Sequence, residues 1–184
     1  MDRLETCRAL ARSLIDDPFY RALQAGLDSL TSYMQASWRE AERIGRVDTL
    51  GPQGAALWMT AGRPDLLAAA RQEKLESFQR FLSPVGLANY LTMVAAMDTN
   101  LPGLLPEGCW YLSILGVAPE LQGQGWGARL LAPALATGQP AYLETFGERS
   151  LKFYERLGFE VVGRFEEPLT ASDYWVMLRT SRTS

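Results

Sequence analysis

Apolar residues recur at steps of three and four along the first part of the chain, a spacing that predicts amphipathic helices. One apolar stripe runs from Leu4 to Leu14, and a second runs from Phe19 to Trp38. Pro18 separates the two stripes, and Gly45 follows the second, so we expect a helix break at the proline and a helix end at the glycine.

The next segment combines a short hairpin with two further helices. Val47 to Leu50 and Ala55 to Met59 are apolar runs around a Gly/Pro-rich turn, which predicts two paired strands. Leu75 to Leu82 and Leu87 to Met97 carry helical stripes on either side of Pro84. The residues that follow, up to 108, are rich in proline and glycine and are expected to form a loop.

The second half alternates strand-like and helix-like segments. Strands are predicted at Trp110 to Val117, Ala141 to Thr145 and Phe159 to Phe165, and helices at Ala128 to Ala136 and Glu148 to Leu157. A helix between two strands supplies the crossover that parallel strands need. The fold class is therefore α/β with a mixed, α+β-like sheet flanked by helices, in one domain over residues 1–184.

A glycine-rich run lies between the first of these strands and the helix after it. It consists of Gln122, Gly123, Gln124, Gly125, Trp126 and Gly127. Glycines let the backbone approach a ligand, and amide groups at a helix N-terminus attract phosphate. The run lacks the Lys-Ser/Thr pair of a P-loop and the spacing of the dinucleotide fingerprint, so both of these nucleotide-site types are excluded.

Two motifs resemble those of the GNAT superfamily of acyl-CoA N-acyltransferases. The Q/R-x-x-G-x-G/A signature is matched by Gln122, Gly125 and Gly127, and the L/F-Y-x-x-x-G-F element by Tyr154, Gly158 and Phe159. The stretch from Trp110 to Val162 most resembles the puromycin N-acetyltransferase-like branch. Shared points are Trp110, Leu112, Gly116, Val117, Pro119, the Gln122 hexapeptide, Leu143 to Thr145, and Phe153 to Phe159.

The resemblance implies a GNAT-like fold in which two central strands splay apart and leave a wedge for acetyl-CoA, the cosubstrate. Those strands would be Trp110 to Val117 and Ala141 to Thr145. The implied cofactor-binding residues are Leu115, Gly116 and Val117 on the strand and Gln122, Gly123, Gln124, Gly125, Trp126, Gly127 and Ala128 in the turn and helix start. Gly116 fits a bulge or a close approach of ligand, and a plain packing glycine is the alternative.

The same resemblance assigns two catalytic candidates. Tyr154 would be the general acid that protonates the leaving thiolate, and its alternative role is packing beside Phe153 and Phe159. Because the chain has no histidine, Glu144 is the leading candidate base, against a purely structural hydrogen bond to backbone or Tyr111. Relatives often carry Asn before the Phe-Tyr pair, where this chain has residues 147–150, so cofactor contacts there are expected to differ.

Composition limits the other function classes. A net charge of −3 and a pI of about 5.1 supply no basic footprint for nucleic acid. Charged residues near the N-terminus and the lack of a long apolar run argue against a leader or a membrane span, so a cytoplasmic location is expected. Cys7 and Cys109 are too few for a metal site, and we expect no metal.

The sequence therefore predicts transfer of an acetyl group from acetyl-CoA to a primary amine of a small molecule by direct attack. The alternatives are acetylation of a protein or peptide amine, and a non-catalytic CoA-binding regulatory module. A homodimer is compatible with the resemblance, and the acceptor amine is not readable. Candidate acceptor-wall residues are Tyr33, Trp38, Trp58, Phe78, Phe81 and Tyr90.

Overall fold

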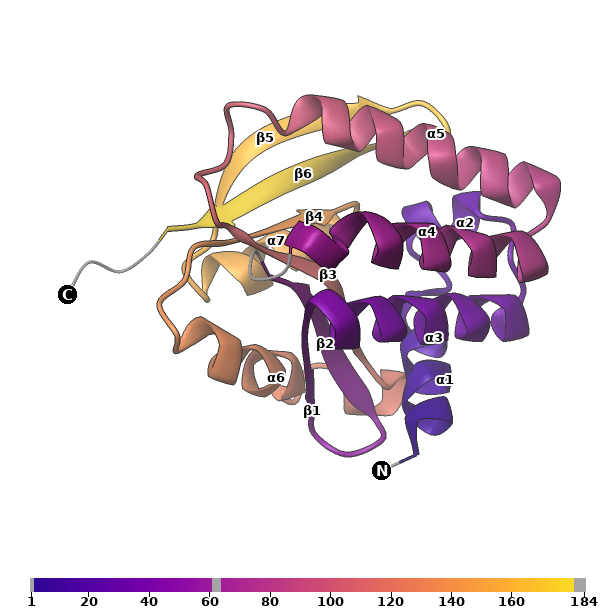
Figure 1. The fold of residues 1–184 in the computed structure, drawn as a ribbon. Helices are drawn as coiled ribbons and strands as arrows, with labels where there is room; N and C mark the ends of the chain where they lie inside the picture. Colours follow the sequence, from indigo (N-terminus) through magenta and orange to yellow (C-terminus); the bar gives the residue numbers. More distant parts are fainter. Residues whose placement is uncertain (1, 61–63, 181–184) are drawn as a thin grey trace.

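The computed structural model describes residues 2–60 and 64–180, and Figure 1 shows how their elements are arranged. The elements follow one another as α1 (Arg3–Leu14), α2 (Pro18–Ala22), α3 (Leu27–Ile44), β1 (Gly45–Thr49), β2 (Gly54–Met59), α4 (Pro64–Phe81), α5 (Pro84–Asn100), β3 (Trp110–Val117), the 3₁₀ helix η1 (Pro119–Leu121), α6 (Trp126–Leu135), β4 (Ala141–Thr145), α7 (Glu148–Glu155), β5 (Glu160–Glu167) and β6 (Ser172–Arg179).

The six strands form one mixed sheet in the order β1-β2-β3-β4-β6-β5. Its neighbouring strands are antiparallel except β3 and β4, which run parallel. That parallel pair is short, because only Trp110 with Ala141 and Tyr111 with Tyr142 are in register. Beyond these residues the two strands diverge, so the expected splay is present between β3 and β4.

Alternate residues of β2 separate two layers of helices. Ala55 and Leu57 belong to a core cluster with α1 and α3, whereas Ala56 and Trp58 belong to a second cluster with α6. Successive side chains of a strand point to opposite faces, so this alternation buries both faces of the sheet. In Figure 1, α1 to α4 accordingly lie on one side of the central strands, and α6 and α7 lie on the other.

The expectation of one continuous helix from Phe19 to Gly45 is wrong. The chain forms two helices there, α2 and α3, with a break at residues 23–26. Gln24 has a φ of 51°, a left-handed conformation that no helix interior accommodates, and Gly26 is the extended N-cap residue of α3. The apolar stripe continues across the break because both helices pack on the same core.

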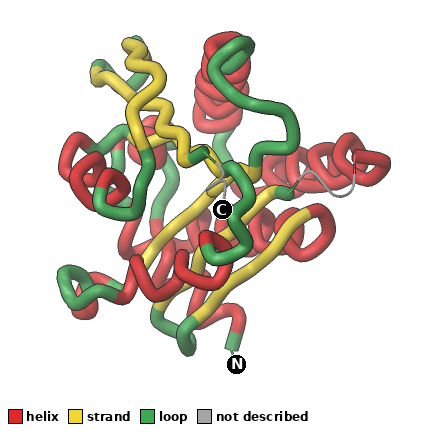
Figure 2. The backbone as a smooth tube through the Cα atoms, turned by 90° about the vertical axis from the view of Figure 1, so that its left-hand side faces the viewer, coloured by secondary structure: helices red, strands yellow, loops and turns green. Residues whose placement is uncertain are grey.

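The last strand, β6, lies between β4 and β5 rather than at the edge. Its residues Tyr174 and Val176 join Met97 of α5 and Phe146 in a third core cluster. Figure 1 shows α5 alongside this β5–β6 pair, and Figure 2 shows the pair turning away from the other strands. The cluster therefore connects α5 to the diverging half of the sheet.

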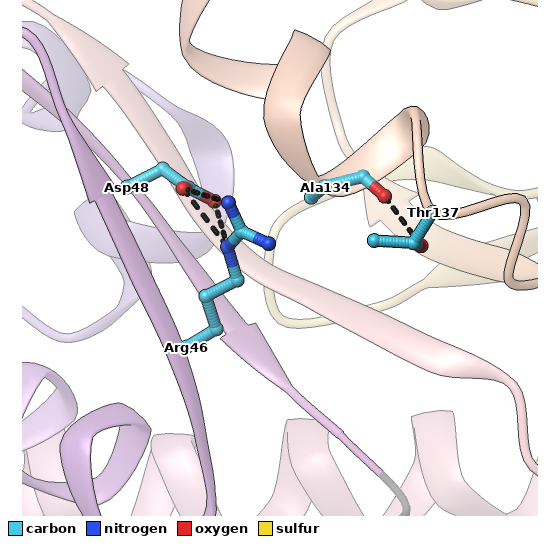
Figure 3. A network of polar contacts seen from close by, with 4 residues as sticks. All are labelled: Arg46, Asp48, Ala134 and Thr137. Carbon is cyan, nitrogen blue, oxygen red and sulfur yellow. Dashed lines mark hydrogen bonds and ion pairs between the residues drawn. The ribbon is translucent and has the colours of Figure 1, made fainter.

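Local polar contacts hold the edge strand β1 and the end of α6, as Figure 3 shows. The Arg46 guanidinium donates to the Asp48 carboxylate at 2.6 and 2.9 Å, two residues apart on one face of β1. The Thr137 hydroxyl donates to the carbonyl of Ala134 at 2.7 Å, and Gly138 has a φ of 74°. A hydroxyl bond and a left-handed glycine of this kind end α6 before β4 begins.

Candidate active site

A cavity of about 510 Å³ occupies the wedge between β3 and β4. The floor comes from residues 111–115 of β3 and 142–145 of β4, and one wall comes from Tyr154 and Ser150 of α7. Side chains of α2 to α5, of the α1–α2 connection and of the end of β2 contribute to the remaining walls. The divergence of the two strands thus provides room for a ligand inside the sheet itself.

Glu144 points into this cavity from β4. Leu143 faces the buried cluster on the α6 side, so alternation places its neighbour Glu144 on the cavity side, as expected. One carboxylate oxygen accepts a hydrogen bond from the Tyr111 hydroxyl at 3.1 Å, and the other is buried without a partner among the residues that the structure describes. Burial raises the pKa of this carboxyl to about 7, against the lowering effect of the Tyr111 bond, and the charge of Asp98 raises it further.

Tyr154 lies in α7 and lines the same cavity. Its ring makes edge contacts with Phe153 at 4.9 Å and Phe159 at 5.8 Å between ring centroids. Burial, and next the charge of Asp17, raise the pKa of the phenol, which keeps it protonated at neutral pH. Tyr154 therefore packs beside Phe153 and Phe159, as its alternative role requires. It also lines the cavity, where its hydroxyl can serve as an acid.

The glycine-rich turn takes the backbone form that a phosphate cradle needs. Gly123 and Gly125 have φ values of 77° and 81°, and a Cβ on either glycine would meet nothing within 4 Å. Gly125 is the N-cap of α6 and has no side-chain cap bond, so the first amides of the helix, from Trp126 to Ala128, remain free of side-chain capping. The turn residues are not part of the cavity lining; they lie just past the end of β3.

Side chains in the turn are held by local contacts. The Gln122 amide donates to the carbonyl of Val117 at 3.1 Å, which ties the turn to the end of β3. The Arg129 guanidinium lies over the Trp126 ring, 4.8 Å from its centroid. Trp126 also packs against the α6 cluster, so its bulk lies along the helix and the space at Gly123 and Gly125 stays open.

Gly116 is a packing glycine and not a bulge. A Cβ there would lie 2.6 Å from the Ser13 hydroxyl and 2.7 Å from a Leu10 methyl group, so α1 packs directly on this position. Gly116 is paired in register with Ala55, and the irregularity of the β2–β3 ladder falls at Ser113, which is skipped between Ile114 and Leu112. The bulge interpretation of Gly116 is therefore wrong. The extra residue of β3 is Ser113, which is one of the residues that line the cavity.

Leu115 to Val117 lie in the part of β3 beyond the β3–β4 register pairs. Among the described residues, no strand pairs with that edge of β3, whereas the opposite edge is paired with β2 throughout. Backbone donors and acceptors along such an edge are available to an extended ligand. Gly127, in the adjacent helix, lets α6 and α7 approach, because a Cβ there would meet the Phe153 ring at 3.0 Å.

The acceptor-wall candidates divide between the cavity and the core. Tyr33 and Tyr90 line the cavity, as expected, whereas Trp38, Trp58 and Phe78 are buried elsewhere in the core. Phe81 packs against the α1–α3 cluster and does not line the cavity. Cys109, whose role the sequence left open, lies in the lining.

Several charged residues of the cavity were missed from the sequence. They are Asp17 in the α1–α2 connection, Glu40 of α3, Arg71 and Lys74 of α4, and Asp98 of α5. Lys74 and Glu40 form a buried ion pair at 2.7 Å. Of these five residues, only Asp17 has a local sequence signal. It is an acidic residue directly before Pro18, which is typical of a helix N-cap. The other four reach the cavity through tertiary packing of helices far apart in the chain.

Within residues 2–60 and 64–180, no group of three or more His, Cys, Asp or Glu side chains is arranged to hold a metal ion. None of the described helices is both long enough and apolar enough to cross a membrane.

A sequence model of the acetyltransferase (GNAT) domain matches residues 88–161 of the chain. The matched segment contains β3, the glycine-rich turn, α6, β4, α7 and the start of β5. It therefore includes every residue proposed above for cosubstrate binding or catalysis.

Solved structures of acetyltransferases have the same fold. The histone acetyltransferase HPA2 and related acetyltransferase from Corynebacterium glutamicum matches with a TM-score of 0.67 at 18% identity, over 100% of this chain and 93% of that one. Arylalkylamine N-acetyltransferase 2 from Aedes aegypti matches with a TM-score of 0.62 at 18% identity, over 96% and 93%. An N-acetyltransferase from Staphylococcus aureus matches with a TM-score of 0.56 at 16% identity, over 96% and 94%.

The mixed sheet flanked by helices is thus the fold of GNAT acetyltransferases, as the sequence predicts. The placement in the puromycin N-acetyltransferase-like branch is not confirmed by these comparisons and stays a prediction.

Proposed function

We propose that this chain is an acetyl-CoA-dependent N-acetyltransferase that acetylates a primary amine of a small molecule by direct attack. One observation carries the proposal: a buried carboxylate, Glu144, and a buried phenol, Tyr154, face one cavity between two splayed strands. Amine acetylation needs a proton acceptor for the ammonium ion and a proton donor for the thiolate. Burial brings the pKa of Glu144 to about 7, so that this carboxyl can take up a proton near neutral pH, and it keeps the Tyr154 phenol protonated.

The cosubstrate would be held from two sides. The unpaired edge of β3 at Leu115 to Val117 supports binding of an extended pantetheine arm, and the open turn at Gly123 and Gly125 supports binding of the pyrophosphate at the start of α6. Bound acetyl-CoA would supply the activated acetyl group. Ser150, which lines the cavity, offers a hydroxyl in the segment where relatives often carry Asn.

Aromatic side chains favour a cationic acceptor with an apolar body. The cavity is lined by Phe19, Tyr20, Tyr33, Tyr90, Tyr111, Tyr142, Phe146 and Tyr154. Faces of such rings attract ammonium groups and pack against rings or alkyl chains. The arylalkylamine N-acetyltransferase with the same fold is consistent with an acceptor of this kind.

Glu144 is proposed as the base. An alkyl amine arrives mostly as its ammonium ion, because its reference pKa is about 10.4. A carboxylate with a pKa of about 7 removes that proton more effectively than an exposed one would. The neutral nitrogen then attacks the thioester carbonyl, and the Tyr154 hydroxyl donates its proton to the departing sulfur.

A panel of amines, assayed for free thiol released from acetyl-CoA, tests this proposal. The panel should hold arylalkylamines, aliphatic monoamines, diamines and a lysine-containing peptide. Thiol release with small amines supports the proposal, and release with the peptide alone supports the protein acetyltransferase instead. A thermal shift with CoA but no turnover of any amine supports the non-catalytic CoA-binding module.

A single domain over residues 1–184, a cytoplasmic site of action, and the lack of nucleic-acid and membrane partners are part of the same proposal. The acidic charge balance supports the absence of a nucleic-acid partner. A homodimer is compatible with the proposed function.

A further inference from the structure

Asp17 is a cavity carboxylate whose position is fixed by the backbone. It lies in the connection between α1 and α2 and caps α2, where its Oδ1 accepts a hydrogen bond from the amide of Phe19 at 2.9 Å. It lines the same cavity as Tyr154 and Glu144. The cap bond uses one oxygen as an acceptor and restricts the carboxylate to one orientation, which a catalytic group needs.

The electrostatic surroundings of Asp17 differ from those of Glu144. Burial raises the pKa of Asp17 to about 6, against the lowering effect of its bonds from the amides of Phe19 and Tyr20. Its charge in turn raises the pKa of Tyr154, while the charge that acts on Glu144 comes from Asp98. Asp17 and Tyr154 thus line one cavity and interact electrostatically, whereas Glu144 accepts a hydrogen bond from Tyr111.

No cation neutralises Asp17 within ion-pair distance among the described residues. Lys74 is paired with Glu40. The charge of Arg71 lowers the pKa of Tyr142, which is another residue of the lining. The titratable and charged groups that line the cavity with Asp17 are Tyr20 of α2, Tyr33 and Glu40 of α3, Arg71 and Lys74 of α4, Tyr90 and Asp98 of α5, Cys109, Tyr111 of β3, Tyr142 and Glu144 of β4, and Tyr154 of α7.

The proposed reaction needs more than one proton acceptor. An ammonium ion that becomes an amide nitrogen loses two protons: one before the nitrogen attacks and one afterwards. One of these protons ends on the thiol, and the other is released to water. The second proton is far more acidic than the first, because the nitrogen that carries it is by then bonded to the acyl carbon, so a weaker base suffices for it.

We propose that Asp17 is the second proton acceptor of the site and returns the proton, through Tyr154, to the departing thiolate; this rests on the proposed function. Glu144 takes the first proton, and the C–N bond forms. Asp17 takes the second proton as an N–H bond breaks and its O–H bond forms. The C–S bond breaks, the sulfur takes the Tyr154 proton, and the proton on Asp17 passes to the Tyr154 oxygen. Glu144 releases its proton to water, so the cycle is balanced.

The replacement Asp17→Asn tests the charge with little change in shape. Asparagine is as good an N-cap as aspartate, so α2 is expected to keep its bond from the Phe19 amide. The neighbouring Asp16 is exposed, and Asp16→Asn is the matched control. We expect Asp17→Asn to lower kcat by about 10- to 100-fold, with the KM for acetyl-CoA unchanged.

The pH profile separates a proton-transfer role from a structural one. In the wild type, log kcat/KM should fall with a slope approaching about two at acid pH, since two carboxylates must be ionised, and Asp17→Asn should reduce the slope to about one. In the ligand-free protein, Asp17→Asn should also flatten the dependence of the unfolding temperature on pH between about 4 and about 6. Asp16→Asn should change neither measurement.

A double-variant comparison tests the route through Tyr154. If Asp17 returns its proton through the phenol, Asp17→Asn combined with Tyr154→Phe should lose less kcat than the product of the two single losses. Multiplied losses would overturn the route, and an Asp17→Asn enzyme with wild-type kcat and slope would overturn the whole inference. Should Asp17→Asn fail to fold, Asp17→Ser keeps a capping hydroxyl and serves for the same measurements. A wild-type chain that acetylates no amine contradicts the proposed function instead.

Discussion

Replacing Glu144 by glutamine should change how the stability of the protein depends on pH. The folded carboxyl has its pKa raised from 4.5 to about 7 by burial, so the folded chain holds this proton more tightly than the unfolded chain does. The stabilisation from the bound proton is complete below pH 4.5, and it is lost as the pH rises through about 7. Glutamine has no proton to lose, so the variant lacks this dependence.

The expected magnitude follows from the size of the pKa shift. Each pKa unit corresponds to about 1.4 kcal/mol, so the free energy of unfolding of the wild type should fall by up to about 3 kcal/mol, relative to the variant, across this window. For a chain of this size that corresponds to about 6–12 °C in Tm. The glutamine can still accept the Tyr111 bond, but its amide group takes the place of the unpartnered oxygen. This second change costs about 1–3 kcal/mol independently of pH, so only the pH dependence identifies the carboxyl group.

Thermal unfolding of both forms from about pH 4.5 to about pH 8 measures the effect, with kcat/KM measured from about pH 6.5 to about 9.5. Glu155→Gln, at an exposed position of α7, is the control. The variant should gain stability relative to wild type as the pH rises, and its activity should be depressed most at the lower end of the range. Parallel unfolding curves would refute the raised pKa, and a constant activity ratio would refute Glu144 as the base.

Three further replacements test other parts of the site. Tyr154→Phe should lower turnover by about 10²-fold with CoA binding intact, and unchanged turnover would leave Tyr154 a packing residue. Saturating CoA should stabilise the wild type by about 2.7 kcal/mol at ~100 times its Kd; Gly125→Glu should abolish this thermal shift, and Gly138→Glu, at an equally open left-handed position, should keep it. Gly116→Ala should cost about 1–3 kcal/mol in urea unfolding, because α1 occupies the space, whereas Gly26→Ala has open space and should cost little.

Local signals predicted the second half of the fold well. The strands at Trp110 to Val117 and Ala141 to Thr145 have the predicted bounds, because each is an apolar run limited by turn residues. The left-handed Gly158 follows α7 as expected. The break after α2 was missed because the apolar stripe continues across it, so periodicity alone gave no sign of two helices.

The composition of the cavity could not be read from the sequence in the same way. Tyr154 and Glu144 were found through motifs and strand alternation, which are local. Asp98 and Arg71 reach the site only because α5 and α4 pack over the splayed strands, and no short-range pattern encodes that packing. No short-range pattern encodes the position of β6 between β4 and β5 either, because a C-terminal hairpin can join the sheet by either of its two strands.

The distribution of charge in the cavity separates structural from functional groups. The fold pairs Glu40 with Lys74 at 2.7 Å, so this buried carboxylate has a cation beside it. Among the described residues, neither Asp17 nor Glu144 receives such a cation, and both have a raised pKa caused chiefly by burial. A chain that can pair one buried carboxylate and leaves two unpaired in the same cavity accepts a stability cost at those two positions. The missing charge is what a protonated amine brings with it, so the acceptor itself would complete the electrostatics of the site.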